Sequence, residues 1–361
     1  MNHWKCGAGV VLVVSLMSLA SGLQAGPKIA MSESGWVKIS VLGQVQYRRE
    51  QDAVAENDFY LRRGRLAFDG QMKDGIRFFF DTDSPNAGKS GNASTSIYIQ
   101  DAFADLRLLK SGDTEFWAAA GLILLPFSFE NKSSAASLLG NDYNSEVLEF
   151  VNDLVWRDYG VEIHGNFGKG ISMRAGVFDG YDGYSTASSE KNPAASLRVT
   201  GHLAVNIIGT AETGSFYTQE RLAKGKYLSL GAGIDTQSKA TRTLVATNNP
   251  VSVEQDSDAW VMDLQSGFEF GSISCTVNAA YYNWDNSKFK GNTMFVEGGA
   301  KYGKGMLTCK YSSSEPDSGD GVTDVTTGIH YFFDQHDARI GIEYRTGDSK
   351  DMILSSLQFL L

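Results

Sequence analysis

The amino-acid sequence predicts an all-β protein, a transmembrane antiparallel β-barrel of about sixteen strands with short turns on one rim and long loops on the other. Three observations favour this fold. Segments of about 8 to 13 residues alternate apolar and polar side chains, which is the period of a strand with two different faces. Every second connection between these segments is short. After the N-terminal segment, no apolar run approaches the ~20 residues that a membrane-spanning helix requires.

The N-terminal segment, residues 1–25, has the pattern of a cleaved secretory signal peptide. One lysine precedes the apolar stretch Ala8–Leu19, and small residues follow it. Cleavage after Ala20 and cleavage after Ala25 both fit the sequence. An uncleaved anchor is the alternative, but the apolar stretch is too short to span a bilayer. We therefore expect residues 26–361 to form a single barrel domain.

The candidate strands follow the alternation along the whole chain. They lie at 36–47, 58–69, 75–83, 96–109, 115–125, 157–166, 170–178, 194–204, 225–236, 258–268, 272–284, 292–302, 305–313, 323–333, 337–346 and 352–360. An even number of strands leaves both chain ends on the same side of the membrane. Residues 205–224 break the rule of alternating connections, because they are long where a short turn is due.

Two neighbouring segments show the two faces of the predicted sheet most clearly. In the first, the side chains expected to face lipid are Ile76, Phe78 and Phe80, opposite Arg77, Phe79, Asp81 and Asp83. In the second they are Ala102, Ala104, Leu106 and Leu108, opposite Asp101, Phe103, Asp105 and Arg107. An unpaired backbone group costs several kcal/mol in hydrocarbon, so a sheet in the membrane must close on itself. Closure directs the apolar face to lipid and the charged face to a water-filled lumen.

Composition excludes several classes of function. The chain has 32 Lys and Arg against 42 Asp and Glu, a formal net charge of -10. This acidic balance argues against a nucleic-acid partner, because binding to phosphate groups requires basic patches. Beyond the signal segment two cysteines remain, Cys275 and Cys309, and we expect free thiols rather than a disulfide.

Catalysis and cofactor binding are not predicted. The alternative of an enzyme barrel requires a Ser-His arrangement, and no such arrangement or Gly-x-Ser-x-Gly element stands out around His164, His202, His330 or His336. No cluster of His and Cys has metal-ligand spacing. We therefore expect no catalytic residue, no metal site and no cofactor.

Several segments in the first half of the chain carry a family resemblance. The two strongest are Gly121–Glu130, with its Pro-Phe pair before a glutamate, and Arg157–Gly165, which begins Arg-Asp-Tyr-Gly-Val. Weaker matches lie at Tyr60–Arg65, Gln100–Phe103 and Ala175–Gly180. Together, and in their order along the chain, these segments resemble the phosphate-selective porin O and P family. The resemblance covers residues 58–180, while the second half of the chain shares only the general strand pattern of the family.

The resemblance implies a sixteen-stranded barrel that assembles as a homotrimer and passes anions along arginines of the lumen. In this sequence Arg63 and Arg65 lie on the predicted inner face, whereas Arg62 has the wrong parity unless a bulge intervenes. The further candidates for pore lining or solute binding are Arg48, Arg77, Arg107 and Arg157. The alternative role of these arginines is purely structural, as partners of the aspartates on the same walls.

The connection Pro126–Trp156 is the candidate constriction of the channel. Its many apolar side chains are too numerous for a loop in water, so we expect it to fold into the lumen. Its charged residues are Glu130, Lys132, Asp142, Glu146, Glu149 and Asp153. Opposed to the arginines, they would create a transverse field that filters solutes by charge. A surface loop packed over the barrel mouth is the alternative.

These observations lead to one expected function and one alternative. We expect an exported porin in a Gram-negative type outer membrane, through which small hydrophilic solutes diffuse passively, inorganic anions such as phosphate among them. Its partners would be the lipid bilayer, these solutes and two further copies of the chain. The alternative is a plugged, structural or adhesive barrel with little conductance.

Overall fold

The computed structural model describes residues 26–51, 56–90, 95–145, 156–180, 189–210, 216–218, 222–245, 251–287 and 289–361. The expected signal peptide at residues 1–25 lies outside this part of the chain. Three charged residues of the candidate constriction, Glu146, Glu149 and Asp153, lie outside it as well.

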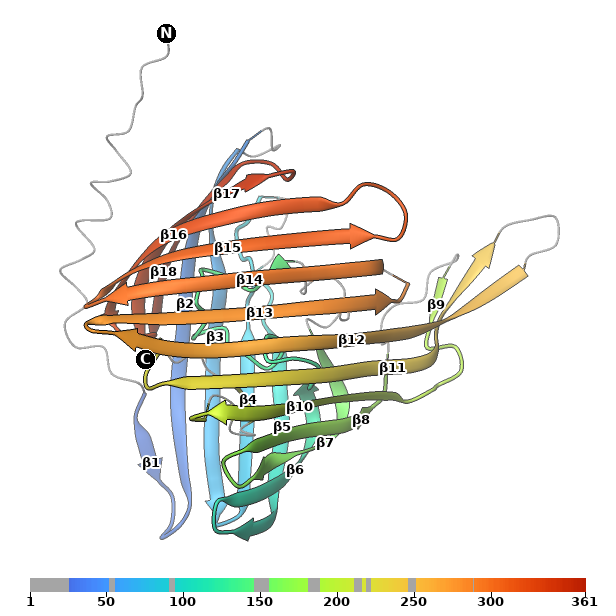
Figure 1. Cartoon of the computed structure of the whole chain (residues 1–361). Helices are drawn as coiled ribbons and strands as arrows, with labels where there is room; N and C mark the ends of the chain where they lie inside the picture. The colour runs from blue at the N-terminus through green and yellow to red at the C-terminus, as the bar shows by residue number, and fades with distance from the viewer. Residues whose placement is uncertain are drawn as a thin grey trace.

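The described residues form one antiparallel sheet that closes into a barrel (Figure 1). Its strands are β1 (Lys28–Ala30), β2 (Trp36–Glu50), β3 (Asn57–Lys73), β4 (Ile76–Asp83), β5 (Tyr98–Ser111), β6 (Thr114–Leu124), β7 (Arg157–Phe167), β8 (Ile171–Phe178), β9 (Ser189–Lys191), β10 (Arg198–Ile208), β11 (Tyr227–Val245), β12 (Val251–Phe270), β13 (Ile273–Asp285), β14 (Lys290–Tyr302), β15 (Gly305–Pro316), β16 (Val322–Asp334), β17 (Ala338–Gly347) and β18 (Met352–Leu360). Within the described ranges, no helix is long and apolar enough to cross a membrane.

Sixteen long strands make the ring, and β1 and β9, with three residues each, are additions to it. The ring is completed where β18 pairs with β2 and where β8 pairs directly with β10, while the short β9 pairs with β11. Each of the sixteen predicted strands is present, so the predicted barrel is confirmed. The C-terminus lies at the rim of short turns (Figure 1).

The largest differences from the predicted bounds are at β11 and β12, which extend into a hairpin beyond the rim (Figure 1). The sequence analysis ended these strands at 236 and began the next at 258, because Ser, Thr and Asn dominate between them. Cross-strand ion pairs support the extension: Glu254 contacts Arg242 at 2.8 Å and Lys239 at 3.0 Å. These ion pairs join residues of two different strands, so no pattern within one segment reveals them.

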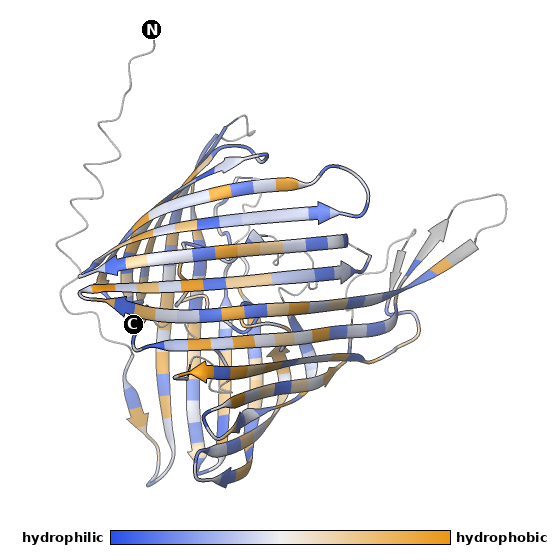
Figure 2. Ribbon diagram, viewed as in Figure 1, coloured by the Kyte–Doolittle hydropathy of each residue, from blue (hydrophilic) through white to orange (hydrophobic). Residues whose placement is uncertain are grey.

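The two faces of the barrel are as different as the alternation predicts, and Figure 2 shows the alternation along the strands. On β5, Leu106 and Leu108 point outward and are 50% and 52% exposed, whereas Asp101 is fully buried on the inner side. The apolar outer surface would be costly in water and suits acyl chains. The hydrogen-bonded wall between the two faces satisfies the backbone without water.

A β-bulge on β3 changes the direction of Arg62, the arginine whose parity did not fit the inner face. Gln44 of β2 is opposite Arg63, and the next residue, Val45, is opposite Leu61, so Arg62 is an extra residue in β3. A bulge adds one residue to one strand and thereby re-aims its side chains. Arg62 and Arg63 consequently both reach into the lumen.

The chain between β10 and β11 explains the irregularity at residues 205–224. β10 continues to Ile208, beyond its predicted end, and residues 216–218 of the connection lie inside the barrel. Thr218 forms a parallel bridge with Ser133, and the ring of Phe216 stacks on Phe103 with centroids 3.8 Å apart. A short turn is absent here because part of this connection packs in the lumen.

Candidate functional site

The connection Pro126–Trp156, called the inner loop below, lies within the barrel over its described residues 126–145 and 156. Phe127, Phe129 and Trp156 are between 0% and 2% exposed. They belong to one apolar cluster with Tyr282, Trp284 and Phe295 of the opposite strands β13 and β14. Burial of several aromatic rings is the main attraction that draws the loop away from the rim and onto the wall.

Hydrogen bonds fix the loop to strands far away in the sequence. The backbone N–H of Phe129 donates to Asp263 on β12 at 3.1 Å. Arg339 on β17 donates to the carbonyl oxygens of Leu138 at 2.6 Å and Gly140 at 2.7 Å. Gln358 on β18 donates to Ala136 O at 2.6 Å. The loop therefore crosses the lumen and is held at both sides of it.

Asp142 joins the inner loop to the arginines of β3. Arg62 Nε lies 2.5 Å from Asp142 Oδ2, and Arg63 Nη2 lies 2.7 Å from Asp142 Oδ1. Burial alone would raise the pKa of Asp142, but the two guanidinium groups outweigh it and hold that pKa well below its ordinary value. Asp142 is therefore ionised throughout the physiological range and anchors the loop to β3.

The predicted pore-lining arginines are each close to a carboxylate. Arg65 donates to Asp83 at 3.0 Å, Arg77 to Asp105 at 2.8 Å and Arg107 to Asp74 at 2.5 Å. Arg157 holds Asp101 by two hydrogen bonds of 3.0 and 2.9 Å, and Arg48 pairs with Glu50. The structure thus brings arginines and acids together as pairs along β2 to β7, the alternative that the sequence left open.

Glu130 and Lys132 make contacts within the protein. Glu130 is 3% exposed and accepts hydrogen bonds from the backbone and side chain of Asn144 at 3.0 and 3.1 Å. Lys132 is fully buried and donates to Leu124 O and to Glu162, both at 2.8 Å. Burial lowers the pKa of Lys132 to about 8 against the opposing pull of Glu162. Both side chains fix the loop in place.

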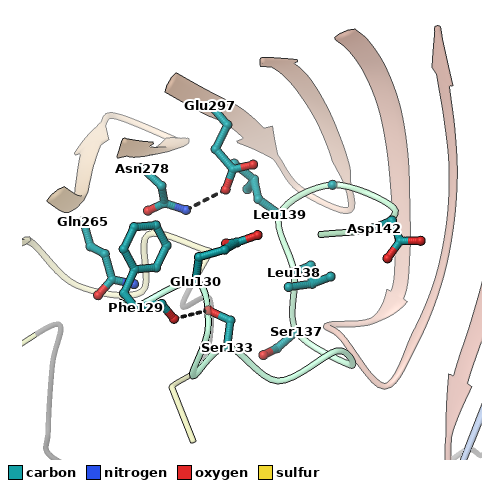
Figure 3. Close-up of a pocket in the computed structure, with 11 residues that line it drawn as sticks. Phe129, Glu130, Ser133, Ser137, Leu138, Leu139, Asp142, Gln265, Asn278 and Glu297 are labelled. Carbon is teal, nitrogen blue, oxygen red and sulfur yellow. Dashed lines mark hydrogen bonds between the residues drawn. The ribbon is translucent and has the colours of Figure 1, made fainter. Parts of the chain in front are cut away.

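The loop lies beside one side of the barrel, and Figure 3 shows its residues Phe129 and Glu130 next to Gln265, Asn278 and Glu297 of that wall. Between the loop and strands β12 to β14 remains a gap of about 10 Å³, which is room for about one water. Glu297 accepts a hydrogen bond from Asn278 at 3.0 Å on this wall, beside Phe129 of the loop. This gap has no room for a solute larger than water.

A larger cavity of about 320 Å³ lies on the other side of the loop, against the strands that carry the arginines. We call it the wall cavity. Its charged lining residues are Lys38, Arg65, Asp69, Arg77, Asp81, Asp105 and Arg157. Loop residues Ser133–Ala136 and Tyr143 line its opposite side, with Phe216 and Tyr217 from the β10–β11 connection. The wall cavity is therefore lined by Arg65, Arg77 and Arg157, three of the predicted pore-lining arginines.

Three contributors to this site were not predicted from the sequence. Arg339 has the inward parity of strand 337–346, so its position was detectable but its contact with the loop was not. Phe216 and Tyr217 are two adjacent aromatic residues in a connection that is too long for its rim. That combination was the available signal for an inserted segment.

The described residues contain no group of three or more His, Cys, Asp and Glu side chains that could hold a metal ion. His164 lies 3.1 Å from Asp105, and His202 lies 2.9 Å from Asp263. Cys275 and Cys309 are both free thiols, as predicted, and Cys309 is exposed on the outer wall.

Solved structures with the same fold are numerous. An anion-selective porin from Comamonas acidovorans is 14% identical with a TM-score of 0.60, covering 91% of this chain and 100% of that one. OmpF of Salmonella typhi, in complex with daunomycin, is 10% identical with a TM-score of 0.61, covering 93% and 100%. The trimer form of OmpT, an outer membrane protein of Vibrio cholerae, is 12% identical with a TM-score of 0.58, covering 91% and 100%. At such identities the likeness shows the fold.

A search of curated proteins finds no match. A family model does match, over residues 42–314, which is more than half of the 361 residues. This range includes the strands that carry the arginines and the whole inner loop, and it extends the predicted resemblance into the second half of the chain. With its barrel fold and its lumenal loop, the chain is an outer-membrane channel that belongs to the phosphate-selective porin O and P family.

Proposed function

We propose that small hydrophilic solutes, with inorganic anions such as phosphate among them, diffuse through this porin along the wall cavity. The observation that carries the proposal is the asymmetry of the lumen. The gap between the inner loop and β12 to β14 is about 10 Å³, whereas the cavity of about 320 Å³ adjoins Arg65, Arg77 and Arg157.

The paired arginines remain suitable for contact with anions. Each guanidinium has more N–H donors than one carboxylate accepts, and it keeps its charge at every physiological pH. The side chain of Arg77 is 37% exposed, in spite of its hydrogen bond to Asp105. Several weak sites in sequence let an ion enter and leave without being trapped. The neighbouring carboxylates moderate the positive field, so we expect a mild preference for anions.

Three further features belong to this proposal. Residues 1–25 direct export and are cleaved. The functional unit is a homotrimer, which is supported by the trimer form of the Vibrio cholerae neighbour. The barrel transports without catalysis, which is supported by the channel family to which it belongs.

Planar-bilayer recording of the purified protein tests the proposal. We expect discrete ohmic current steps, and a reversal potential in a KCl gradient that indicates a preference for chloride. The double variant Arg65→Gln/Arg77→Gln should shift that potential toward potassium, because it removes two positive charges from the cavity wall and leaves Asp83 and Asp105 without their arginines. Arg242→Gln, in the hairpin beyond the rim, is the matched control and should cause no shift.

Two outcomes would contradict the proposal. A wild-type barrel that inserts but carries no current is plugged or structural. An unchanged reversal potential in the double variant, with native β-sheet content by circular dichroism, removes these arginines from the solute path.

A further inference from the structure

The wall cavity has an aromatic side that passage of small inorganic ions does not require. Phe79 of β4 is directly opposite Phe103 of β5 in the register, and their ring centroids are 5.7 Å apart. Phe216 stacks on Phe103 at 3.8 Å, and Tyr217 meets Phe79 edge-on at 5.6 Å. All four rings line the cavity. Aromatic pairs prefer such offset and edge-to-face arrangements, so the sides of these rings that line the cavity offer the same kind of contact to the ring of a ligand.

Residues 216–218 are firmly held in this position. The backbone N–H of Thr218 donates to Lys132 O at 2.8 Å, and its hydroxyl donates to Phe129 O at 3.1 Å. The ammonium of Lys132 lies 4.0 Å from the centre of the Phe216 ring. The chain thus places two aromatic residues in the lumen from the rim opposite to the inner loop, and it fixes them to that loop.

A cation lies next to the rings. Arg77 and Phe79 are two residues apart on β4, so both face the lumen, about 7 Å from each other along the strand. The guanidinium of Arg77 is stacked on Trp117 at 3.4 Å, which fixes its plane. One of its N–H groups donates to Asp105 at 2.8 Å, and its other donors remain at its edge. Lys38, on β2, lines the same cavity directly opposite Asp69 in the register, and no salt bridge joins it to a described residue.

Size and charge narrow the class of ligand. The volume of about 320 Å³ is within the lower range of small-molecule sites. Of the four cations that line the cavity, Arg65 is bound to Asp83, Arg157 to Asp101 and Arg77 to Asp105. Lys38 and the remaining N–H donors of Arg77 are left for a ligand, which suits an anion with a single charge.

We propose that the wall cavity is a binding site for small monovalent aromatic acids of the benzoate type. The ring lies among Phe79, Phe103 and Phe216, and the carboxylate is bound by Arg77 and Lys38. This inference rests on the proposed function, since it names a class of solute for the same passage. Phe216 and Tyr217 are the specificity-determining residues of this site.

Titration of single-channel KCl current with benzoate, acetate and phosphate tests this site. We expect benzoate to block the current at concentrations about threefold to tenfold lower than acetate, the contribution of an aromatic contact. Phe216→Leu and Phe79→Leu should each remove most of this difference while the current without benzoate persists. Phe80→Leu is the matched control, because it removes a ring from the outer face of the same strand.

Calorimetry of benzoate binding to the detergent-solubilised barrel separates this inference from the proposed function. Binding by a barrel that conducts no ions would overturn the channel proposal and leave the site in place. Equal block by benzoate and acetate in a conducting barrel would overturn the site. Wild-type block retained in both the Phe216→Leu and Phe79→Leu variants would do so too.

Discussion

Replacement of Arg339 by methionine should loosen the tip of the inner loop. This buried guanidinium donates to Leu138 O at 2.6 Å and to Gly140 O at 2.7 Å. A hydrogen bond from a charged donor contributes roughly 1.5–3 kcal/mol, so Arg339→Met removes about 3–6 kcal/mol of anchoring. Because about 1.4 kcal/mol corresponds to a factor of ten, even the lower value raises the population of the detached tip more than about a hundredfold.

Other anchors keep the rest of the loop in the lumen. Glu343 accepts from the backbone N–H of Asn141 at 2.8 Å, and Asp142 remains bound to Arg62 and Arg63. We therefore expect rapid current noise and a larger mean conductance in single-channel recordings of Arg339→Met, without full opening. Arg345→Met is the matched control on the same strand, because Arg345 does not contact the loop in the described residues. Equal noise and conductance in wild type, Arg339→Met and Arg345→Met would refute the role given to this hydrogen-bonded tip.

Three further predictions follow from charged residues of the loop and from the outer wall. The pKa of Asp142 is held far below 3.8, so its contribution to loop anchoring is present at neutral pH and is lost only below the ordinary carboxyl range. Acidification to about pH 4 should therefore raise the current noise of the Arg62→Gln/Arg63→Gln variant more than that of the wild type. The pKa of Lys132 is lowered to about 8, so the native state releases this proton at a lower pH than the unfolded state does. The stability of the wild type in detergent should therefore rise with pH from about 8 to 10.5 relative to that of Lys132→Met. Melting temperatures of the two proteins that change in parallel with pH would contradict this. Cys309 is exposed on the outer wall, so a water-soluble maleimide should label it in detergent and fail to do so in liposomes.

The strands were predictable because their signal is local. Alternation along each segment gave the inner and outer faces and put Arg77 and Asp105 on the same face. The structure adds the register of β4 with β5, in which these two residues are opposite each other. The bulge at Arg62 was recognisable as a break in parity. Each of these features depends on neighbours within about one strand length.

The interior of the lumen was harder to predict because its contacts join distant residues. Arg339 and Leu138 are 201 positions apart, and Thr218 and Phe129 are 89 apart. Composition showed that the inner loop has too much apolar surface for water, but not which wall it covers. The loop charges Glu130 and Lys132 were expected to act on solutes, and their burial with Asn144 and Glu162 depends on packing that no local pattern encodes.

The accessibility of cysteines placed at two adjacent positions of β2 tests most directly whether solutes pass along the wall cavity. Ser40 lines the cavity, whereas the adjacent Val41 faces outward and is 40% exposed. In a background with Cys275 and Cys309 replaced by alanine, an anionic thiosulfonate reagent added in solution should reduce the current of Ser40→Cys and leave that of Val41→Cys unchanged. An unaffected current in Ser40→Cys, with the thiol shown by mass spectrometry to have reacted, would contradict passage along this wall.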